Sequence, residues 1–206
     1  VVGSQTFNYT GSIINFVVPA GVNSVTIQAK GAQGGAGESA PAGSGGLGAD
    51  MTGTFNVTPG QTLKVLVGQQ GGGSPFTSGA GGGGGTFVTD NLNNPMIIAG
   101  GGGGIHGTLV PVGINAVTTN NGVDGYSADA GYPSLIGIGG TGGNGATGSD
   151  PHAGNGGGLL SNGAIGQCGG PGLSFLNGGA GGFSCTADID LGGFGGGGGE
   201  IGRAHV

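Results

Sequence analysis

The fold is decided by residues 51–71, which read MTGTFNVTPGQTLKVLVGQQG. From Met51 to Thr58, apolar or small residues alternate with polar ones, and this period of two is typical of a half-buried β-strand. The tripeptide Thr58-Pro59-Gly60 predicts a turn, and the aliphatic run at residues 62–67 predicts a second strand. We therefore expect a β-hairpin from Met51 to Val67.

Similar patterns predict further strands in the first half of the chain. They lie at residues 6–10, 13–18, 25–30, 86–89 and 95–99. Residues 96–99 are apolar without alternation, which indicates burial on both faces of that strand. Strands at such short spacing favour an all-β fold, an antiparallel β-sandwich or jelly-roll.

Glycine makes up 61 of the 206 residues and divides the chain into two regions. In residues 1–104 it separates the predicted strands, and in residues 105–199 it dominates, recurring every three residues at Gly163, Gly166, Gly169 and Gly172. Three residues per turn is the period of the polyproline-II (PPII) helix, which has no internal hydrogen bonds. Because glycine lets neighbouring backbones approach, several such helices can hydrogen-bond one another. We expect a bundle of glycine-rich PPII helices whose other residues point outward or into a seam, as with Ile138, Thr141, Asn144 and Thr147.

The composition excludes several classes of protein. Each interior glycine disfavours a helix by about 0.8–1.0 kcal/mol relative to alanine, so a helical domain is nearly ruled out. Three Lys and Arg residues against nine Asp and Glu give a formal net charge of −6, so no basic surface for nucleic acid or anionic lipid can form. No apolar run reaches the roughly 18 residues of a membrane span.

No catalytic or cofactor-binding pattern stands out from the glycine background. Residues 43–48 and 137–142 fit the dinucleotide-binding pattern G-x-G-x-x-G, but matches are expected by chance at this glycine content. The first match also leads into a predicted strand, where that pattern requires a helix. No nucleophile stands beside a histidine and a carboxylate, so we expect neither an enzyme nor a cofactor.

The best candidate for a binding region is the stretch 105–136, which interrupts the glycine. A long loop in a compact domain is often functional. It contains the candidate contact residues Asp124, Tyr126, Asp129 and Tyr132. Calcium binding by Asp124, Asp129, Asp150, Asp188 and Asp190 is an alternative, but the repeated register of calcium-binding β-rolls is absent.

Cys168 and Cys185 are the only cysteines, with sixteen residues between them. A disulfide is the interpretation we favour, and a loop of this length would be stabilised by about 3 kcal/mol. Two free thiols remain an alternative. Half of a metal site is another, although a closed zinc site needs four ligands and His106 and His152 are distant in sequence. Asn8 and Asn56 occupy glycosylation sequons, and Asn56 falls on the polar face of its predicted strand.

The last seven residues, 200–206, read EIGRAHV. One back-translation of this heptapeptide matches a common sequencing adapter. We therefore interpret these residues as adapter read-through, with a natural tail as the alternative, and leave them out of the fold prediction. Together with the start at Val1, this suggests a fragment or a mature piece of a larger protein.

Five blocks of the sequence resemble the glycine-rich extracellular domain of the anaplastic lymphoma kinase and leukocyte tyrosine kinase receptors. They occur in the family's order and read AQGGAG (32–37), LKVLVGQQG (63–71), GGGGGTFV (81–88), PMIIAGGGGG (95–104) and GGFGGGGG (192–199). Similar domains occur in bacterial and protist surface proteins. The family's final glycine block, its closing strands and its long cysteine-bearing inserts are missing here.

The resemblance implies a β-sandwich related to tumour necrosis factor folds, from which packed glycine helices emerge. It also implies an extracellular or cell-surface domain that binds a ligand and acts as a scaffold without catalysis. We expect a non-enzymatic domain whose partner is a protein or a glycan. The alternatives are the ligand-binding ectodomain of a receptor tyrosine kinase, a bacterial or phage adhesin, and a structural or ice-binding glycine bundle.

Overall fold

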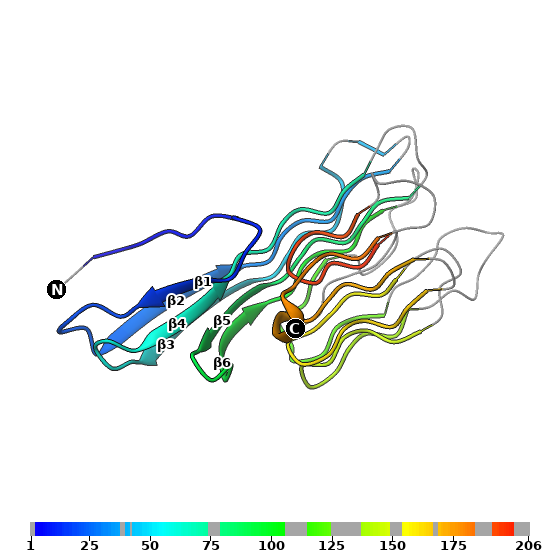
Figure 1. Ribbon diagram of the computed structural model, residues 1–206. Helices are drawn as coiled ribbons and strands as arrows, with labels where there is room; N and C mark the ends of the chain where they lie inside the picture. The colour runs from blue at the N-terminus through cyan, green and yellow to red at the C-terminus, as the bar shows by residue number, and fades with distance from the viewer. Residues whose placement is uncertain are drawn as a thin grey trace.

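The computed structural model describes residues 3–37, 40–41, 43–73, 79–105, 115–124, 137–148, 154–166, 169–183 and 191–199. Within these residues the protein is nearly all β, with antiparallel sheets and one short 3₁₀ helix, η1 (Phe175–Asn177) (Figure 1). The strands are β1 (Ile14–Val17), β2 (Ser24–Lys30), β3 (Asp50–Asn56), β4 (Thr62–Leu66), β5 (Thr86–Asp90) and β6 (Pro95–Ala99).

The strands form two antiparallel sheets, ordered β1-β4-β5-β6 and β2-β3. The turn predicted at Thr58-Pro59-Gly60 is confirmed, because Gln61 N donates to Thr58 O at 2.9 Å and Gly60 has a φ of +83°. The predicted hairpin from Met51 to Val67 is wrong. The turn instead joins strands of different sheets, since β3 pairs with β2 while β4 pairs with β1 and β5.

Four of the other five predicted strands are confirmed as β1, β2, β5 and β6. The strand predicted at residues 6–10 is wrong. That segment forms no ladder with either sheet, and its alternation alone could not supply a pairing partner.

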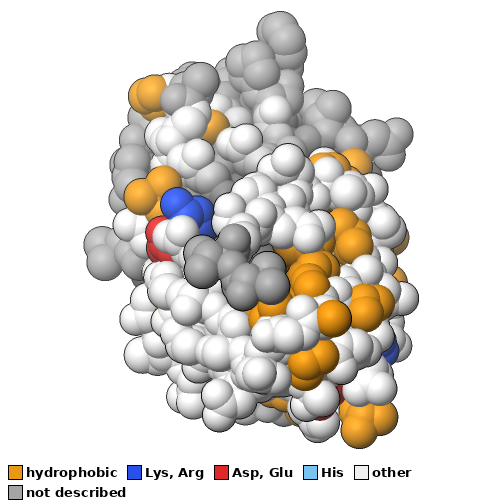
Figure 2. Space-filling model, turned by 90° about the vertical axis from the view of Figure 1, so that its left-hand side faces the viewer, with side chains coloured by type: hydrophobic (Ala, Val, Ile, Leu, Met, Phe, Trp, Pro, Cys, Tyr) orange, Lys and Arg blue, Asp and Glu red, His pale blue; other side chains and the backbone are white. Residues whose placement is uncertain are grey.

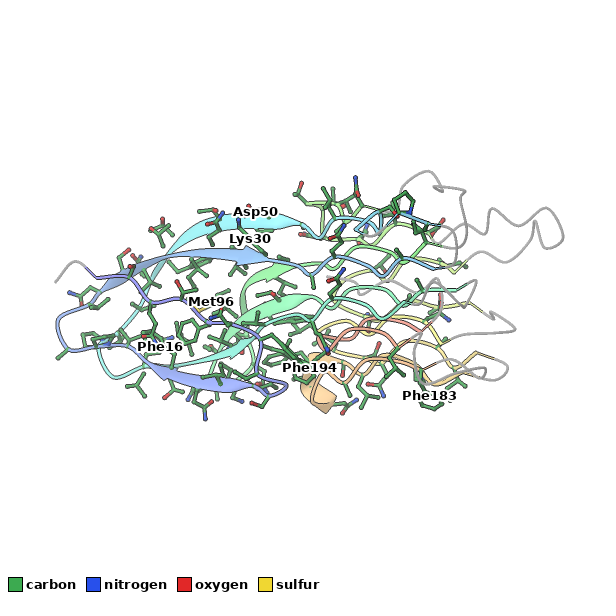
Figure 3. All side chains as sticks on the ribbon, turned by 90° about the horizontal axis from the view of Figure 1, so that it is seen from above. Phe16, Lys30, Asp50, Met96, Phe183 and Phe194 are labelled. Carbon is green, nitrogen blue, oxygen red and sulfur yellow. The ribbon has the colours of Figure 1, made fainter. Side chains whose placement is uncertain are left out.

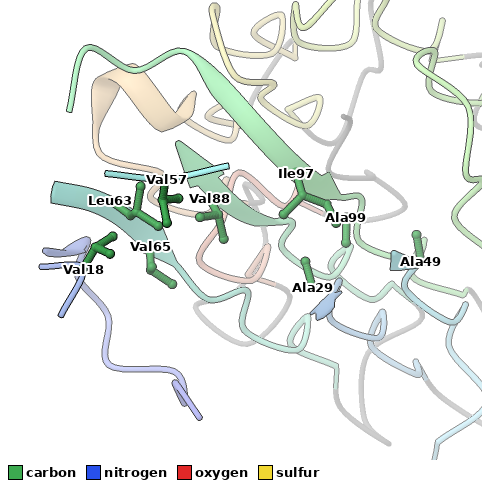
Figure 4. Packing of buried hydrophobic residues seen from close by; sticks show 9 residues of the cluster. All are labelled: Val18, Ala29, Ala49, Val57, Leu63, Val65, Val88, Ile97 and Ala99. Carbon is green, nitrogen blue, oxygen red and sulfur yellow. The ribbon is translucent and has the colours of Figure 1, made fainter. Parts of the chain in front are cut away.

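A first hydrophobic cluster unites residues of both sheets (Figure 4). From the four-stranded sheet come Leu63, Val65, Val88, Ile97 and Ala99, and Ala29 comes from the two-stranded sheet. Val18, Ala49 and Val57, just beyond strand ends, complete its buried members. Because one apolar cluster takes residues from both sheets, it holds the sheets together.

A second hydrophobic cluster joins the four-stranded sheet to the glycine-rich second half of the chain. Leu66 and Phe87 meet Leu159 and Phe175 there, and the Phe87 and Phe175 ring centroids are 5.6 Å apart. Ile98 also packs against this cluster, whereas its β6 neighbours Ile97 and Ala99 belong to the first. The predicted burial on both faces of this strand is thereby confirmed.

Five of the six strands continue directly into glycine segments (Figure 1). We call them the strand-continuing segments, and they comprise residues 31–37, 43–49, 67–73, 79–85 and 100–105. The junction is tied by the buried hydroxyl of Thr86, which donates to Lys30 O at 2.6 Å and accepts from Gly68 N at 3.0 Å.

The strand-continuing segments keep the register of the strands they prolong. Lys30 lies opposite Asp50 in the β2–β3 ladder, and the same alignment leads to bonds from Gly31 N to Ala49 O (2.8 Å) and from Gly34 N to Gly46 O (2.9 Å). The β4–β5 alignment likewise continues with bonds from Gly84 to Gln69 and from Gly81 to Gly72. Hydrogen-bonded positions are three residues apart in these segments, whereas they recur every two residues in an antiparallel ladder.

Each strand-continuing segment also bonds to neighbours outside its own ladder. Ala32 N and Gly35 N, again three residues apart, donate to Gly84 O and Gly81 O, both at 2.9 Å. Gly35 O accepts from Ile105 N at 3.2 Å. Residues 31–37 therefore have neighbours in more directions than the two that a strand inside a flat sheet has.

The outward placement predicted for the second half is confirmed where the structure describes it. Gly163, Gly166, Gly169 and Gly172 are buried, and Ile138, Thr141, Asn144 and Thr147 are exposed. The run 138–147 folds back on itself, however. Asn144 N donates to Thr141 O at 3.1 Å, and Ile138 pairs with Thr147 across the resulting turn.

Candidate binding surface

Of the residues predicted from the sequence to serve as a site, Asp124 alone lies in the described part of the chain. Tyr126, Asp129, Tyr132, Cys168 and Cys185 lie outside the described residues, as do the histidines considered as metal ligands, His106 and His152. Asp124 and the loop that carries it, residues 115–124, therefore define the candidate binding surface.

The carboxylate of Asp124 fastens the loop to the glycine framework. Its Oδ1 accepts a hydrogen bond from Gly139 N at 2.9 Å. Two residues earlier, Gly122 N donates to Gly140 O at 2.8 Å, and Asn121 forms an antiparallel bridge with Thr141. One oxygen of Asp124 thus has a positioning role.

The other end of the described loop, residues 115–124, is fastened to a different glycine segment. Leu47 N donates to Asn115 Oδ1 at 2.8 Å, and Ala116 N donates to Leu47 O at 2.8 Å. The loop is held at both ends, so its central side chains are presented from fixed points.

Between the two attachments, four consecutive polar residues are exposed. They are Thr118, Thr119, Asn120 and Asn121. Hydroxyl and amide groups both donate and accept hydrogen bonds, which suits a polar ligand such as a glycan. Sequence reasoning named the loop but missed this row, although the run TTNN was the signal available.

The framework that carries the loop is packed backbone against backbone. A Cβ added at Gly34 would overlap the carbonyl of Gly103, and one added at Gly101 would overlap the carbonyl of Gly83. At the ends of these segments Ala36 bridges to Ile105. The close packing fixes the points from which the connecting loops leave.

Charged groups on the described surface are few. Lys30 and Asp50 form an exposed ion pair with a 3.4 Å Nζ–Oδ2 distance on the β2–β3 sheet (Figure 3). Hydrogen bonds from the Asn94 side chain, and then from the backbone of Asn94 and Leu92, hold the pKa of Asp90 below its usual range. These hydrogen bonds organise the β5–β6 turn.

Large hydrophobic side chains are exposed at several places. On the face of the molecule at the strand end, Figure 2 shows hydrophobic side chains gathered along one side. The exposed set is Tyr9, Val17, Leu47, Leu92, Ile138, Leu160, Ile165, Leu176, Phe183 and Leu191. The two sequon asparagines, Asn8 and Asn56, are exposed as well, which confirms the placement predicted for Asn56.

The described residues contain no group of three or more His, Cys, Asp or Glu side chains that could hold a metal ion. Within the same residues, no helix has the length and apolar character needed to cross a bilayer. No protein-family model matches the chain, and no curated protein sequence does either.

Proposed function

We propose that this chain is a non-enzymatic, extracellular glycine-rich domain of a larger surface protein, and that it displays a binding surface for a protein or glycan partner. In this proposal the two sheets form a β-sandwich, and the glycine segments form a bundle of PPII helices. This is the arrangement that the resemblance of the five sequence blocks to the receptor family implies.

The first hydrophobic cluster supports the sandwich. The apolar residues of β4, β5 and β6 and those of β2 belong to one cluster, as the inner faces of two packed sheets do.

The hydrogen bonds of the glycine segments support PPII helices. The donors Gly31 and Gly34 reach one neighbour, and the donors Ala32 and Gly35 reach another. A helix with three residues per turn points every third residue in the same direction, so it produces this pattern. A β-strand, with a period of two, does not.

The observation that carries the binding role is the loop held at both ends. Asn115 and Asp124 fasten it to two different glycine segments, and the exposed row from Thr118 to Asn121 lies between them. A framework packed through backbone contacts gives such a row a fixed position, which lowers the entropy lost on binding.

A binding screen tests this role. The chain is probed against arrays of glycans and of extracellular protein domains, beside a variant in which Thr118, Thr119, Asn120 and Asn121 are all replaced by Ala. We expect the variant to lose the binding that the native chain shows. A control with Ser4→Ala and Gln5→Ala, two exposed residues of the N-terminal segment, retains it. Binding that survives both the fourfold change and removal of residues 105–136 would refute this assignment.

We also propose a disulfide between Cys168 and Cys185, as an extracellular setting allows. The nearest described contact is the antiparallel bridge between Gly170 and Phe183, which exchange two hydrogen bonds of 2.9 and 3.0 Å. In sequence, Cys168 lies two residues before Gly170 and Cys185 lies two residues after Phe183, so the two cysteines fall at matching positions of the same antiparallel register.

Alkylation before and after reduction tests the disulfide. We expect both thiols to resist the reagent until the protein is reduced. We also expect Cys168→Ser to lower the free energy of unfolding by about 3 kcal/mol. Full alkylation of the unreduced, unfolded chain would show that the bond is absent.

A further inference from the structure

The N-terminal segment, residues 3–12, is attached to the protein in an unusual way, and we call it the arm. It runs beside β1 in the opposite direction (Figures 1 and 3). Within the described part of the chain, the backbone N–H and C=O groups of residues 3–11 form no hydrogen bond. The hydroxyl of Thr10 bonds to Ser12, which is a contact inside the arm.

Two aromatic side chains hold the arm in place. The ring of Phe7 meets the ring of Phe16 edge-on at a centroid distance of 5.6 Å and packs against the first hydrophobic cluster. The ring of Tyr9 meets that of Phe194 at 5.9 Å, while Tyr9 stays 45% exposed. All residues of the arm other than Phe7 are exposed. Phe16 and Phe194 lie on different elements, β1 and the last glycine segment, as Figure 3 shows.

These contacts make the arm the least firmly held of the described segments around the sheets. Ordering an extended segment costs backbone entropy at every residue, and no backbone hydrogen bond from residues 3–11 to the other described residues offsets that cost. A segment with one half-buried anchor belongs to the low-stability end of a structure and opens without unfolding the rest. Gly11, with a φ of +73°, lies where the chain reverses from the arm into β1 and provides a hinge.

We propose that the arm is exchangeable: it undocks at Gly11, and the arm of a second copy of this chain docks against Phe16 and Phe194 in its place. The occupant follows from the contacts themselves. A second copy supplies the same Phe7 and Tyr9, so docking between copies forms every contact that docking within one copy forms. Exchange of an identical element is a low-cost route to association. Copies displayed together on a surface would meet at the high local concentration that favours it.

Brief chymotrypsin digestion of the native full-length chain, followed by mass spectrometry, tests the first half of the proposal. Chymotrypsin cleaves after Phe and Tyr and needs the segment around the bond to leave its neighbours. We therefore expect cleavage after Phe7 or Tyr9 well before any cleavage after Phe16 in β1 or Phe87 in β5. An arm that resists the protease as long as β1 and β5 do would overturn the proposal. This measurement requires no substitution, so it holds even for a chain that tolerates none.

A labelled peptide with the sequence of residues 3–12 tests docking from another chain. We expect it to bind the Phe7→Ala chain, whose own arm lacks its anchor, at least about tenfold more tightly than the native chain. A peptide that itself carries Phe7→Ala is expected not to bind. The Gln5→Ala chain is the matched control, and it should bind the labelled peptide no better than the native chain does. A folded Phe7→Ala chain that fails to bind the native peptide would overturn the proposal.

Sedimentation of the native chain then tests exchange between whole chains. We expect a dimer whose fraction rises with chain concentration and falls when the unlabelled peptide is added in excess. A chain that stays monomeric up to about 1 mM, where weak self-association becomes visible, would refute exchange between copies. These outcomes are independent of the loop at residues 115–124, so they test the arm separately from the proposed binding surface.

Discussion

Replacing Gly34 by Ala should be among the most damaging single-methyl changes in this protein. Gly34 is buried in a strand-continuing segment, and an added Cβ would overlap the carbonyl group of Gly103 and approach Gly104 N at 2.8 Å. All of these atoms belong to the backbone, so no side chain can rotate away. The segment at residues 100–105 must move as a whole.

The cost can be worked out from what that movement disturbs. Overpacking of a tight interior costs about 1–3 kcal/mol. The bonds from Gly34 N to Gly46 O and from Gly46 N to Gly103 O, both 2.9 Å, lie on either side of the overlap. A buried polar group left unpaired costs about 1–3 kcal/mol, while the entropy that Ala removes from the unfolded chain returns about 0.4–1 kcal/mol. Taking the middle of each range, the net loss is about 3 kcal/mol, out of a typical total of about 5–15 kcal/mol.

Urea unfolding followed by far-ultraviolet circular dichroism measures this loss, with two other glycines as controls. Gly3 has open space around its Cβ position and no left-handed φ, so Gly3→Ala should change the free energy of unfolding by less than about 0.5 kcal/mol. Gly21 also has open space but a φ of +81°, so Gly21→Ala should cost about 1–2 kcal/mol through backbone strain alone. If Gly34→Ala proves no more costly than Gly21→Ala, the argument from backbone packing is wrong.

Three further predictions concern the sheet–glycine junction, the second hydrophobic cluster and the β5–β6 turn. Thr86→Val removes the hydroxyl that ties the sheet–glycine junction and should cost about 2 kcal/mol, whereas Thr52→Val on the exposed face of β3 should cost almost nothing, as measured by urea unfolding. Phe175 is only 2% exposed in the second hydrophobic cluster, so Phe175→Ala leaves a cavity there and should lower the free energy of unfolding by about 3–5 kcal/mol in the same assay. Because the pKa of Asp90 is lower in the folded chain than in the unfolded chain, the ionised carboxylate stabilises the folded state at pH values above the unfolded pKa of about 4. This stabilisation is lost as the pH falls through the pKa that Asp90 has in the folded chain. A pH series should therefore show a shallower acid loss of stability for Asp90→Asn than for the native chain, and parallel curves would contradict the role given to the Asn94 hydrogen bonds.

The strands could be predicted because their signal is local. Alternation in residues 51–58 and the aliphatic run at residues 62–67 depend on neighbouring side chains, and both became strands. Strand pairing was not predictable in the same way. The turn at Thr58-Pro59-Gly60 fits a hairpin as well as a crossing between sheets, and contacts distant in sequence decided between them.

The candidate binding surface was likewise predictable only in part. The stretch containing Asp124 could be singled out because it interrupts the glycine, but the attachments to Gly139 and Leu47 could not be foreseen. They join residues 15 and 68 positions apart in sequence, and no local pattern encodes such a distance. The exposure of the row from Thr118 to Asn121 depends on those attachments.

By itself, the sequence determined that this chain is built from β-strands and closely packed glycine, because side-chain alternation and the absence of Cβ atoms are properties of single positions. Only the tertiary structure decided which segments meet. The period of three in residues 163–172 is visible in the sequence, but the register shared by Gly31 with Ala49 and by Gly34 with Gly46 is not. Glycines have no side chains by which one segment could be distinguished from another. Their partners are therefore set by the strands at their ends, whose side chains fix the alignment that the glycine segments then continue.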